Sequence, residues 1–290
     1  MNRSEKNENI LLVIRGRYSS MTKAEKRVAD YILENPKAVR FMSITDLADA
    51  CNVGYTSVFR FCKTLKLQGY QDFRILLSMS IMDNGGGENE FFPAAITIND
   101  TIADAAKKLM QSHINTIAET NALLDAKMLQ EATDYINNAD QLRFFGLGAS
   151  QLTAMEGMYK FLHIMPNVYC LSDTHMQLMG ASTLNEKDVA VFISQSGSSK
   201  EIVEMAKKAK KGGAKTISIT RHTNSPLATY SDVVLLCGGY DSPLESESSC
   251  VKIAQLHVLD LLFTQVYRIR FNYSKSINIQ VAKSIIDKDY

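Results

Sequence analysis

The sequence predicts two domains of different class: an all-α domain, followed by an α/β domain in which helices flank a five-stranded parallel sheet. Three observations predict this. Apolar residues up to about position 80 recur at helical spacing. Beyond a glycine-rich stretch, five short apolar runs rich in β-branched residues alternate with helical segments, as in a buried parallel sheet. The chain of 290 residues is also long enough for two domains.

These changes of pattern also predict the domain boundaries. We assign residues 1–80 to the helical domain and residues 99–270 to the α/β domain. Residues 81–98 are the expected linker, because they contain three consecutive glycines. Residues 271–290 form a tail with a weak helical pattern and no assignable role.

Within the first domain, one segment predicts a DNA-binding motif. Thr22 and Glu25 form a capping-box pattern before a helix that Asn35 and Pro36 end. Residues 43–65 then read as a short helix, a tight turn at 52–54 and a second helix that begins with short hydroxyl residues. This succession is typical of a helix-turn-helix. A plain helical hairpin has the same pattern, so both interpretations stay open on this ground.

The second helix of this motif supplies the candidate DNA contacts. In a helix-turn-helix, its first residues meet base edges, and its basic residues contact phosphates. The candidates on or near its exposed side are Thr56, Ser57, Arg60 and Lys63. The charge of this domain agrees with DNA binding. Residues 1–80 hold 13 Lys/Arg and 8 Asp/Glu, a net of +5, within a chain of net charge +1. A basic amino-terminal domain favours nucleic acid as its partner.

Strands and helices alternate regularly in the second domain. We expect strands at residues 142–147, 168–171, 189–194, 216–220 and 233–237. We expect helices at residues 101–124, 126–137, 151–165, 174–184, 200–211, 225–230 and 248–269. Such alternation means a parallel sheet that is covered on both faces.

The third expected strand leads into a serine-rich loop, residues 194–199 (Ser-Gln-Ser-Gly-Ser-Ser), and a helix then opens. The first amides of a helix have no partner within it, and the helix dipole favours negative charge there. Hydroxyl donors without charge suit a phosphate monoester better than a metal or a nucleophile. The other interpretation is a turn whose serines only cap the helix.

A second glycine cluster supports the phosphate interpretation. Residues 146–150 (Gly-Leu-Gly-Ala-Ser) also follow a strand and open a helix, so both loops belong at the carboxyl edge of the sheet, where such folds bind ligands. A dinucleotide fingerprint needs a third glycine, but Gln151 stands there, and no Gly-Lys-Ser/Thr occurs in the chain. A small phosphorylated ligand is therefore favoured over a nucleotide.

These two loops, together with residues 206–213, 216–220 and 225–227, resemble the sugar isomerase (SIS) domain, a phosphosugar-binding α/β module. The resemblance covers roughly residues 126–270. It implies that hydroxyls and the loop backbone hold the phosphate. The positions that carry over are Ser150, Ser194, Gln195, Ser196 and Ser199. Gly148, His175 and Glu245 are further ligand-binding candidates, although His175 also fits a surface or packing histidine and Glu245 also fits a helix N-cap region. The family usually has Thr where this chain has Ser199, and the hydroxyl is kept.

The first domain carries a second resemblance. Residues 21–32, 44–48, 57–63 and 69–73 resemble the RpiR-type helix-turn-helix domain, which in that family precedes an SIS domain. The resemblance implies a sequence-specific transcription regulator of carbohydrate metabolism that a sugar phosphate controls. It implies double-stranded operator DNA and a sugar-phosphate effector as partners, a homodimer or homotetramer, and no cofactor.

Two other functions are compatible with the sequence, namely an isomerase and an interaction module. A sugar-phosphate isomerase with a fused helical domain needs a catalytic base, for which His175, Glu245 and Glu247 are available. None of them demands that role, so we predict a protein that is not an enzyme. The third function is a carbohydrate-responsive interaction module that does not contact DNA.

Cysteine usage and hydropathy predict the compartment. The five cysteines are scattered, odd in number and without a Cys-x-x-Cys pair, which favours reduced thiols and argues against a metal site. The first residues are polar, and no apolar run has the length of a membrane span. We therefore expect a cytoplasmic protein without a membrane partner.

Overall fold

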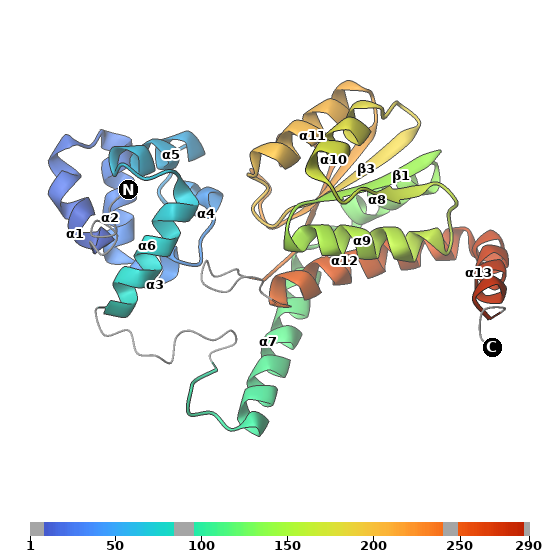
Figure 1. Cartoon of the computed structure of the whole chain (residues 1–290), viewed down its shortest axis with the longest axis horizontal. Coiled ribbons are helices and arrows are strands. Elements are labelled where there is room, and N and C mark those ends of the chain that lie inside the picture. Colours follow the sequence, from blue (N-terminus) through green and yellow to red (C-terminus); the bar gives the residue numbers. More distant parts are fainter. Residues whose placement is uncertain (1–8, 84–95, 240–248, 287–290) are drawn as a thin grey trace. The chain divides into compact units, whose positions relative to one another are not determined.

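The computed structural model describes residues 9–83, 96–239 and 249–286 (Figure 1). The chain divides into two compact units, which are described separately. The first holds the described residues up to Asn115 together with residues 249 and 250, and the second holds the rest. The division falls inside one helix, α7, whereas the sequence placed that whole helix in the α/β domain. Most of the expected linker lies outside the described residues.

The first unit is helical throughout its described residues, as predicted. Its elements are α1 (Ile10–Arg17), the 3₁₀ turn η2 (Tyr18–Ser20), α2 (Lys23–Glu34), α3 (Pro36–Val39), α4 (Ile44–Ala50), α5 (Tyr55–Thr64), α6 (Tyr70–Asp83) and the first part of α7 (Ile102–Leu123). Val28, Ile32, Leu47, Phe61 and Phe73 are fully buried in one core. These positions recur at helical spacing, so each helix turns one apolar face inward.

The predicted capping box is confirmed. Glu25 Oε2 accepts a hydrogen bond from Thr22 N at 2.8 Å, and Thr22 Oγ1 accepts one from Glu25 N at 3.4 Å. Glu25 Oε1 also accepts a bond of 2.7 Å from the Thr64 hydroxyl, which ties the start of α2 to the end of α5. Burial raises the pKa of Glu25, but the hydrogen bonds from Thr22 and Thr64 outweigh burial and hold it below its usual value. The helix ends at Glu34 as predicted, although Pro36 then opens the short helix α3, whose first position tolerates proline.

The second unit is built on a five-stranded, all-parallel sheet, as predicted. The strand order is β2-β1-β3-β4-β5. The strands are β1 (Gln141–Gly146), β2 (Val168–Cys170), β3 (Asp188–Ile193), β4 (Lys215–Thr220) and β5 (Val233–Leu236). The helices are α8 (Ala126–Asn137), α9 (Ala149–Leu162), α10 (Thr174–Ser182), α11 (Lys200–Lys211), α12 (Ser249–Ile269) and α13 (Phe271–Ile286). The weak helical pattern of the tail is therefore a real helix.

One expected helix, residues 225–230, is wrong in its extent. Only the 3₁₀ turn η5 (Ala228–Tyr230) forms there. The preceding segment is held by other partners, because Leu227 N donates to the Gly197 carbonyl at 2.9 Å and Ala228 N donates to the Ser225 hydroxyl at 3.3 Å. The first bond ties this segment to the serine loop, and only the residues that follow form a helical turn.

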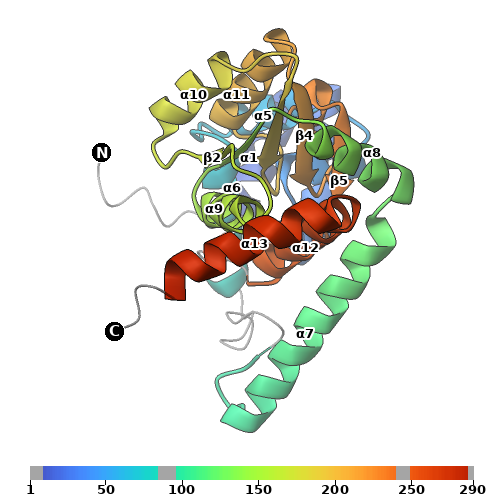
Figure 2. The same cartoon turned by 90° about the vertical axis from the view of Figure 1, so that its right-hand side faces the viewer.

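Helices cover both faces of the sheet (Figure 1). Along β3, Val189, Val191 and Ile193 point into a core made with α8, α9 and α12. Ala190 and Phe192 point into a second core made with α10 and α11. This alternation is the two-residue period of a strand with apolar layers on both sides. From the side, α8 lies beside β5 at one edge of the sheet (Figure 2).

The cysteine thiols are not poised for reaction. All five cysteines are free, and burial raises the pKa of Cys62 and of Cys237 to about 12. Such thiols are unreactive near neutral pH. Among the described residues, no cluster of His, Cys, Asp or Glu could hold a metal ion. No helix in the described part of the chain is long and apolar enough to cross a membrane.

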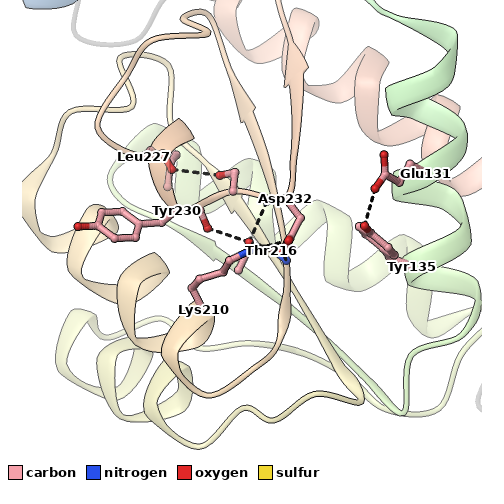
Figure 3. A network of polar contacts seen from close by, with 8 residues as sticks. Glu131, Tyr135, Lys210, Thr216, Leu227, Tyr230 and Asp232 are labelled. Carbon is pink, nitrogen blue, oxygen red and sulfur yellow. Dashed lines mark hydrogen bonds and ion pairs between the residues drawn. The ribbon is translucent and has the colours of Figure 1, made fainter.

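A polar network fastens the amino ends of β4 and β5, at the sheet edge opposite the two glycine-containing loops (Figure 3). Asp232 Oδ2 accepts a hydrogen bond from Thr216 N at 2.9 Å, and its other oxygen pairs with Lys210 of α11. Burial raises the pKa of Asp232, but the Lys210 ammonium and the bonds from Thr216 outweigh burial and lower it. The network joins two strands and a helix.

We expect Asp232→Asn to destabilise the second unit by about 1–2 kcal/mol at neutral pH, because the replacement keeps the shape but loses the ionic partner of Lys210. A carboxyl whose pKa is lowered by folding stabilises the fold above its unfolded pKa of about 4 and loses that contribution as pH falls through the folded pKa. The difference in melting temperature between wild type and variant should therefore shrink on acidification below about pH 4. A difference that stays constant between pH 7 and pH 3 would contradict this assignment.

Candidate functional site

The two loops predicted from the sequence meet at the point where the strand order reverses. β2 lies on one side of β1, whereas β3, β4 and β5 follow on the other. Gly146 of β1 and Ile193 of β3 are paired in register, so the loops that follow them begin side by side at the carboxyl edge. Open parallel sheets bind ligands at such a switch point.

Both helices that leave this point begin without a side-chain cap. Gly148 precedes α9 and Ser199 precedes α11, and neither side chain bonds an amide of its helix. The neighbouring helices α8 and α10 are capped by Asp125 and Asp173. The Ser199 hydroxyl is thus exposed and does not serve as a cap, unlike in the capping-only interpretation of the loop. Uncapped amides at two adjacent helix starts favour an anion between them.

The serine loop has a fixed backbone shape. Gly197 has φ +59°, and a Cβ there would lie 2.3 Å from the Ser225 hydroxyl oxygen. Ser194 Oγ accepts a hydrogen bond from Gly197 N at 3.2 Å. The turn therefore admits only glycine at this position, and it packs directly on the segment before η5.

The hydroxyls predicted to hold a phosphate differ in exposure. Ser194 is buried, Ser196 is half-buried and Ser199 is exposed. Ser196 Oγ accepts a bond from the Ser198 hydroxyl at 2.9 Å, so both belong to one cluster. Ser150, in the first turn of α9, lies 3.5 Å from Gln255 Nε2 of α12. The structure therefore brings these hydroxyls to two adjacent loops at one edge of the sheet.

Gln195 faces protein partners. Its Nε2 donates to the Gly239 carbonyl at 2.8 Å, and the Cys237 thiol lies 3.6 Å from its Oε1. Its backbone carbonyl accepts a bond from Arg221 N at 3.1 Å. These contacts give Gln195 a role in positioning the loop against the ends of β4 and β5.

Of the other two predicted ligand contacts, His175 lies on a different helix from this cluster, and Glu245 lies outside the described residues. His175 is exposed in the first turn of α10, the helix that follows β2. Since β2 pairs with β1, this turn also lies at the carboxyl edge.

Sequence reasoning assigned no role to Gln177, which is fully buried. Its Oε1 accepts a bond from Gly146 N at 3.2 Å, and its Nε2 donates to the Gly146 carbonyl at 3.0 Å. Both polar groups of the last residue in β1 are thereby satisfied beside the ligand loop. A Cβ on Gly146 would lie 2.4 Å from the Ser150 carbonyl, so this strand end is also packed against α9. The sequence signal for Gln177 was an amide side chain between two apolar residues of α10.

The end of α7 is clamped to the same edge by three polar contacts, which the sequence did not predict. Glu119 Oε2 accepts a bond from Gly239 N at 3.2 Å, and Thr120 Oγ1 accepts one from Gly238 N at 3.0 Å. Arg221 Nη1 lies 3.2 Å from Glu119 Oε1 and 3.1 Å from the Gly239 carbonyl. Because Gln195 bonds that carbonyl too, one network joins the serine loop to α7.

In the first unit, the predicted helix, turn and helix are α4, residues 51–54 and α5. Asn52 adopts φ +50°, and Val53 N donates to the Ala48 carbonyl at 2.9 Å, which closes the turn. Thr56, Arg60 and Lys63 are exposed on α5, whereas Ser57 is half-buried. Polar and basic candidates therefore share the outward face of this helix, apart from Ser57 at its margin.

Comparison with known proteins covers both units. Residues 8–84 match the model of the helix-turn-helix domain of the rpiR family, and residues 135–265 match the model of the SIS domain. An uncharacterized HTH-type transcriptional regulator of Caldanaerobacter subterraneus subsp. tengcongensis is 37% identical over 266 residues, covering 91% of this chain and 92% of the relative. The HTH-type transcriptional regulator HexR of Pseudomonas aeruginosa is 33% identical over 264 residues, covering 89% of each chain.

A solved structure is similar over both units. It is the Vibrio vulnificus NanR protein complexed with ManNAc-6P, with a TM-score of 0.84 and 27% identity. The similarity covers 97% of this chain and 100% of that chain.

Proposed function

This chain belongs to the RpiR-type family of transcriptional regulators, and we propose that it binds operator DNA sequence-specifically and controls carbohydrate metabolism in response to a sugar phosphate. The observation that carries the proposal is the pair of uncapped helix starts at the switch point, surrounded by serine hydroxyls. An uncharged set of donors holds a phosphate without a metal or cofactor.

In this proposal, the phosphate binds between the starts of α9 and α11. The hydroxyls of Ser150, Ser194, Ser196 and Ser199 and the backbone at Gly148 donate to it, and Gln195 positions the loop. His175 and Glu245 contact the sugar. The ManNAc-6P in the Vibrio vulnificus relative supports a phosphorylated sugar as the ligand class.

Control of DNA binding requires a path from this site to the rest of the chain, and we propose that the path is α7. Its end is bonded to Gly238 and Gly239, and Gly239 is bonded to Gln195 of the ligand loop. A ligand that moves this loop therefore changes the contacts of α7. It shifts the protein between two arrangements only by the difference in its affinity for them.

We further propose that the protein acts as a homodimer through the second unit, because helix-turn-helix proteins bind paired half-sites as dimers. Four apolar residues on one side of α9 and two on α10 are exposed in the single chain. They are Leu152, Met155, Tyr159, Leu162, Met176 and Met179, each 40% or more exposed. Such exposed apolar residues are typical of a protein interface. Operator binding also implies that the protein works in the cytoplasm.

We expect Ser196→Ala to weaken sugar-phosphate binding by at least about tenfold, because a hydrogen bond to a charged group is lost. The fold should stay intact, since Ser196 is only half-buried. The measurement is the rise in melting temperature on adding a panel of sugar phosphates, including ManNAc-6P, with each non-phosphorylated sugar as control. Ser182→Ala, on exposed α10 surface, is the matched variant that should bind as wild type. Equal binding by Ser196→Ala would remove Ser196 from the site, and turnover of the ligand would favour the isomerase alternative.

We expect Glu119→Gln to separate ligand binding from its effect on DNA, because it removes the ionic partner of Arg221 at the end of α7. Ligand affinity should stay within about twofold of wild type, a change of about 0.4 kcal/mol. The change in operator affinity on adding ligand should become smaller. Glu204→Gln, on the exposed side of α11, is the control. A full response to ligand in Glu119→Gln would exclude this path.

We expect Tyr159→Asp to produce monomers in sedimentation velocity, because a charge in the centre of an apolar interface is not compensated. Tyr159 is 60% exposed in the single chain, so the fold itself should tolerate the change. Ile279→Asp, at a 47% exposed position of α13, tests the other apolar surface. Monomers from Ile279→Asp alone would place the interface on α13 instead.

A further inference from the structure

The outward face of α5 is not uniformly polar. Val58, Phe61 and Cys62 of this helix are buried, whereas Thr56, Arg60 and Lys63 are exposed. Two aromatic residues, Tyr55 and Phe59, share that exposed face. At 100° per residue, Phe59 lies between Tyr55 and Lys63 and close to the middle of the face.

Packing within the unit covers only part of Phe59. Its side chain is 38% exposed. Leu67 and Tyr70, from the segment that follows α5, pack against the apolar core of the unit, but Phe59 is outside the described core and its packed neighbours. An apolar ring on a polar and basic face therefore has a solvent-facing surface that no core contact explains.

The Phe59 ring is nevertheless held in place. The Lys63 ammonium lies 5.3 Å from its centroid and donates to the Gln68 carbonyl at 2.7 Å. A Cβ built on Gly69 would lie 4.0 Å from Phe59 Cε2, so the ring edge rests near the backbone of the turn before α6. A ring with a restricted position loses little conformational entropy when it binds a partner.

We propose that Phe59 reads thymine in the operator, through contact of its ring with the C5-methyl group in the major groove. This proposal rests on the proposed DNA binding of α5. The thymine methyl is the apolar group that the major-groove edge of a base pair presents, and side chains such as Phe contact it. Arg60 and Lys63 place positive charge on the same exposed side of α5, which favours the DNA backbone on this face over an apolar protein partner.

The polar candidates and Phe59 therefore act differently. Lys63 and Arg60 bind phosphates and raise affinity for any duplex. Phe59 instead distinguishes thymine from the other bases, because a methyl group at that place in the groove occurs on thymine alone among the four.

The test begins with selection of duplexes from a random DNA pool by the full-length protein. Each thymine of the selected site is then replaced by deoxyuridine, which keeps the hydrogen-bonding edge and removes only the methyl group. For wild type, one replacement per half-site should weaken binding about fourfold, the value of burying one methylene-sized group, about 0.8 kcal/mol. For Phe59→Ala, the same replacement should have no effect.

Three variants keep the outcome interpretable. Phe59→Leu should retain part of the discrimination, since it keeps an apolar contact. Arg60→Ala should weaken binding to both duplexes equally and reduce the salt dependence. Phe59→Ala should melt close to wild type, because the ring is outside the core. Two results overturn the proposal for Phe59 alone. In one, replacement by deoxyuridine weakens binding equally in wild type and in Phe59→Ala. In the other, replacement of no thymine weakens binding by the wild type. Failure to select any sequence overturns the proposed DNA binding as well.

Discussion

The pairing of β1 with β3 is the constraint on which the site depends. Because Gly146 and Ile193 are in register at the carboxyl edge, the two strands release their loops at the same level, one toward α9 and the other toward α11. Both helices then begin at the switch point with amides that no side chain of their own cap satisfies. In the proposed site, a phosphate accepts hydrogen bonds at these two helix starts, which no capping side chain occupies.

Two amide side chains hold this arrangement in place. Gln177 satisfies the backbone at the end of β1, and Gln195 connects the serine loop to the backbone after β5. The second of these connections continues through Gly239 to Glu119 of α7. The same contacts that fix the ligand loop therefore attach it to α7, which makes a rigid site compatible with control at a distance.

Local signals predicted much of the fold, and long-range contacts account for most of what they missed. The capping box at Thr22 and the apolar run of β3 depend on neighbouring residues, so both were readable from the sequence. Residues 225–230 look helical locally, but Leu227 bonds Gly197, 30 positions earlier in the chain, and only a 3₁₀ turn forms. The clamp of Arg221 on Glu119 joins residues 102 positions apart and has no local pattern. The exposed Phe59 was overlooked for another reason: its helical spacing was clear, but an apolar residue on an outward face carried no predicted role.

The central claim, a phosphate held between two helix starts, is tested most directly by amide hydrogen exchange of the full-length protein with and without each sugar phosphate of the panel. The account predicts that a phosphorylated ligand protects amides in residues 146–151 and 194–202, and that the matching non-phosphorylated sugar does not. Protection of other segments by the same ligand, with these two unchanged, would contradict the account and place the effector elsewhere.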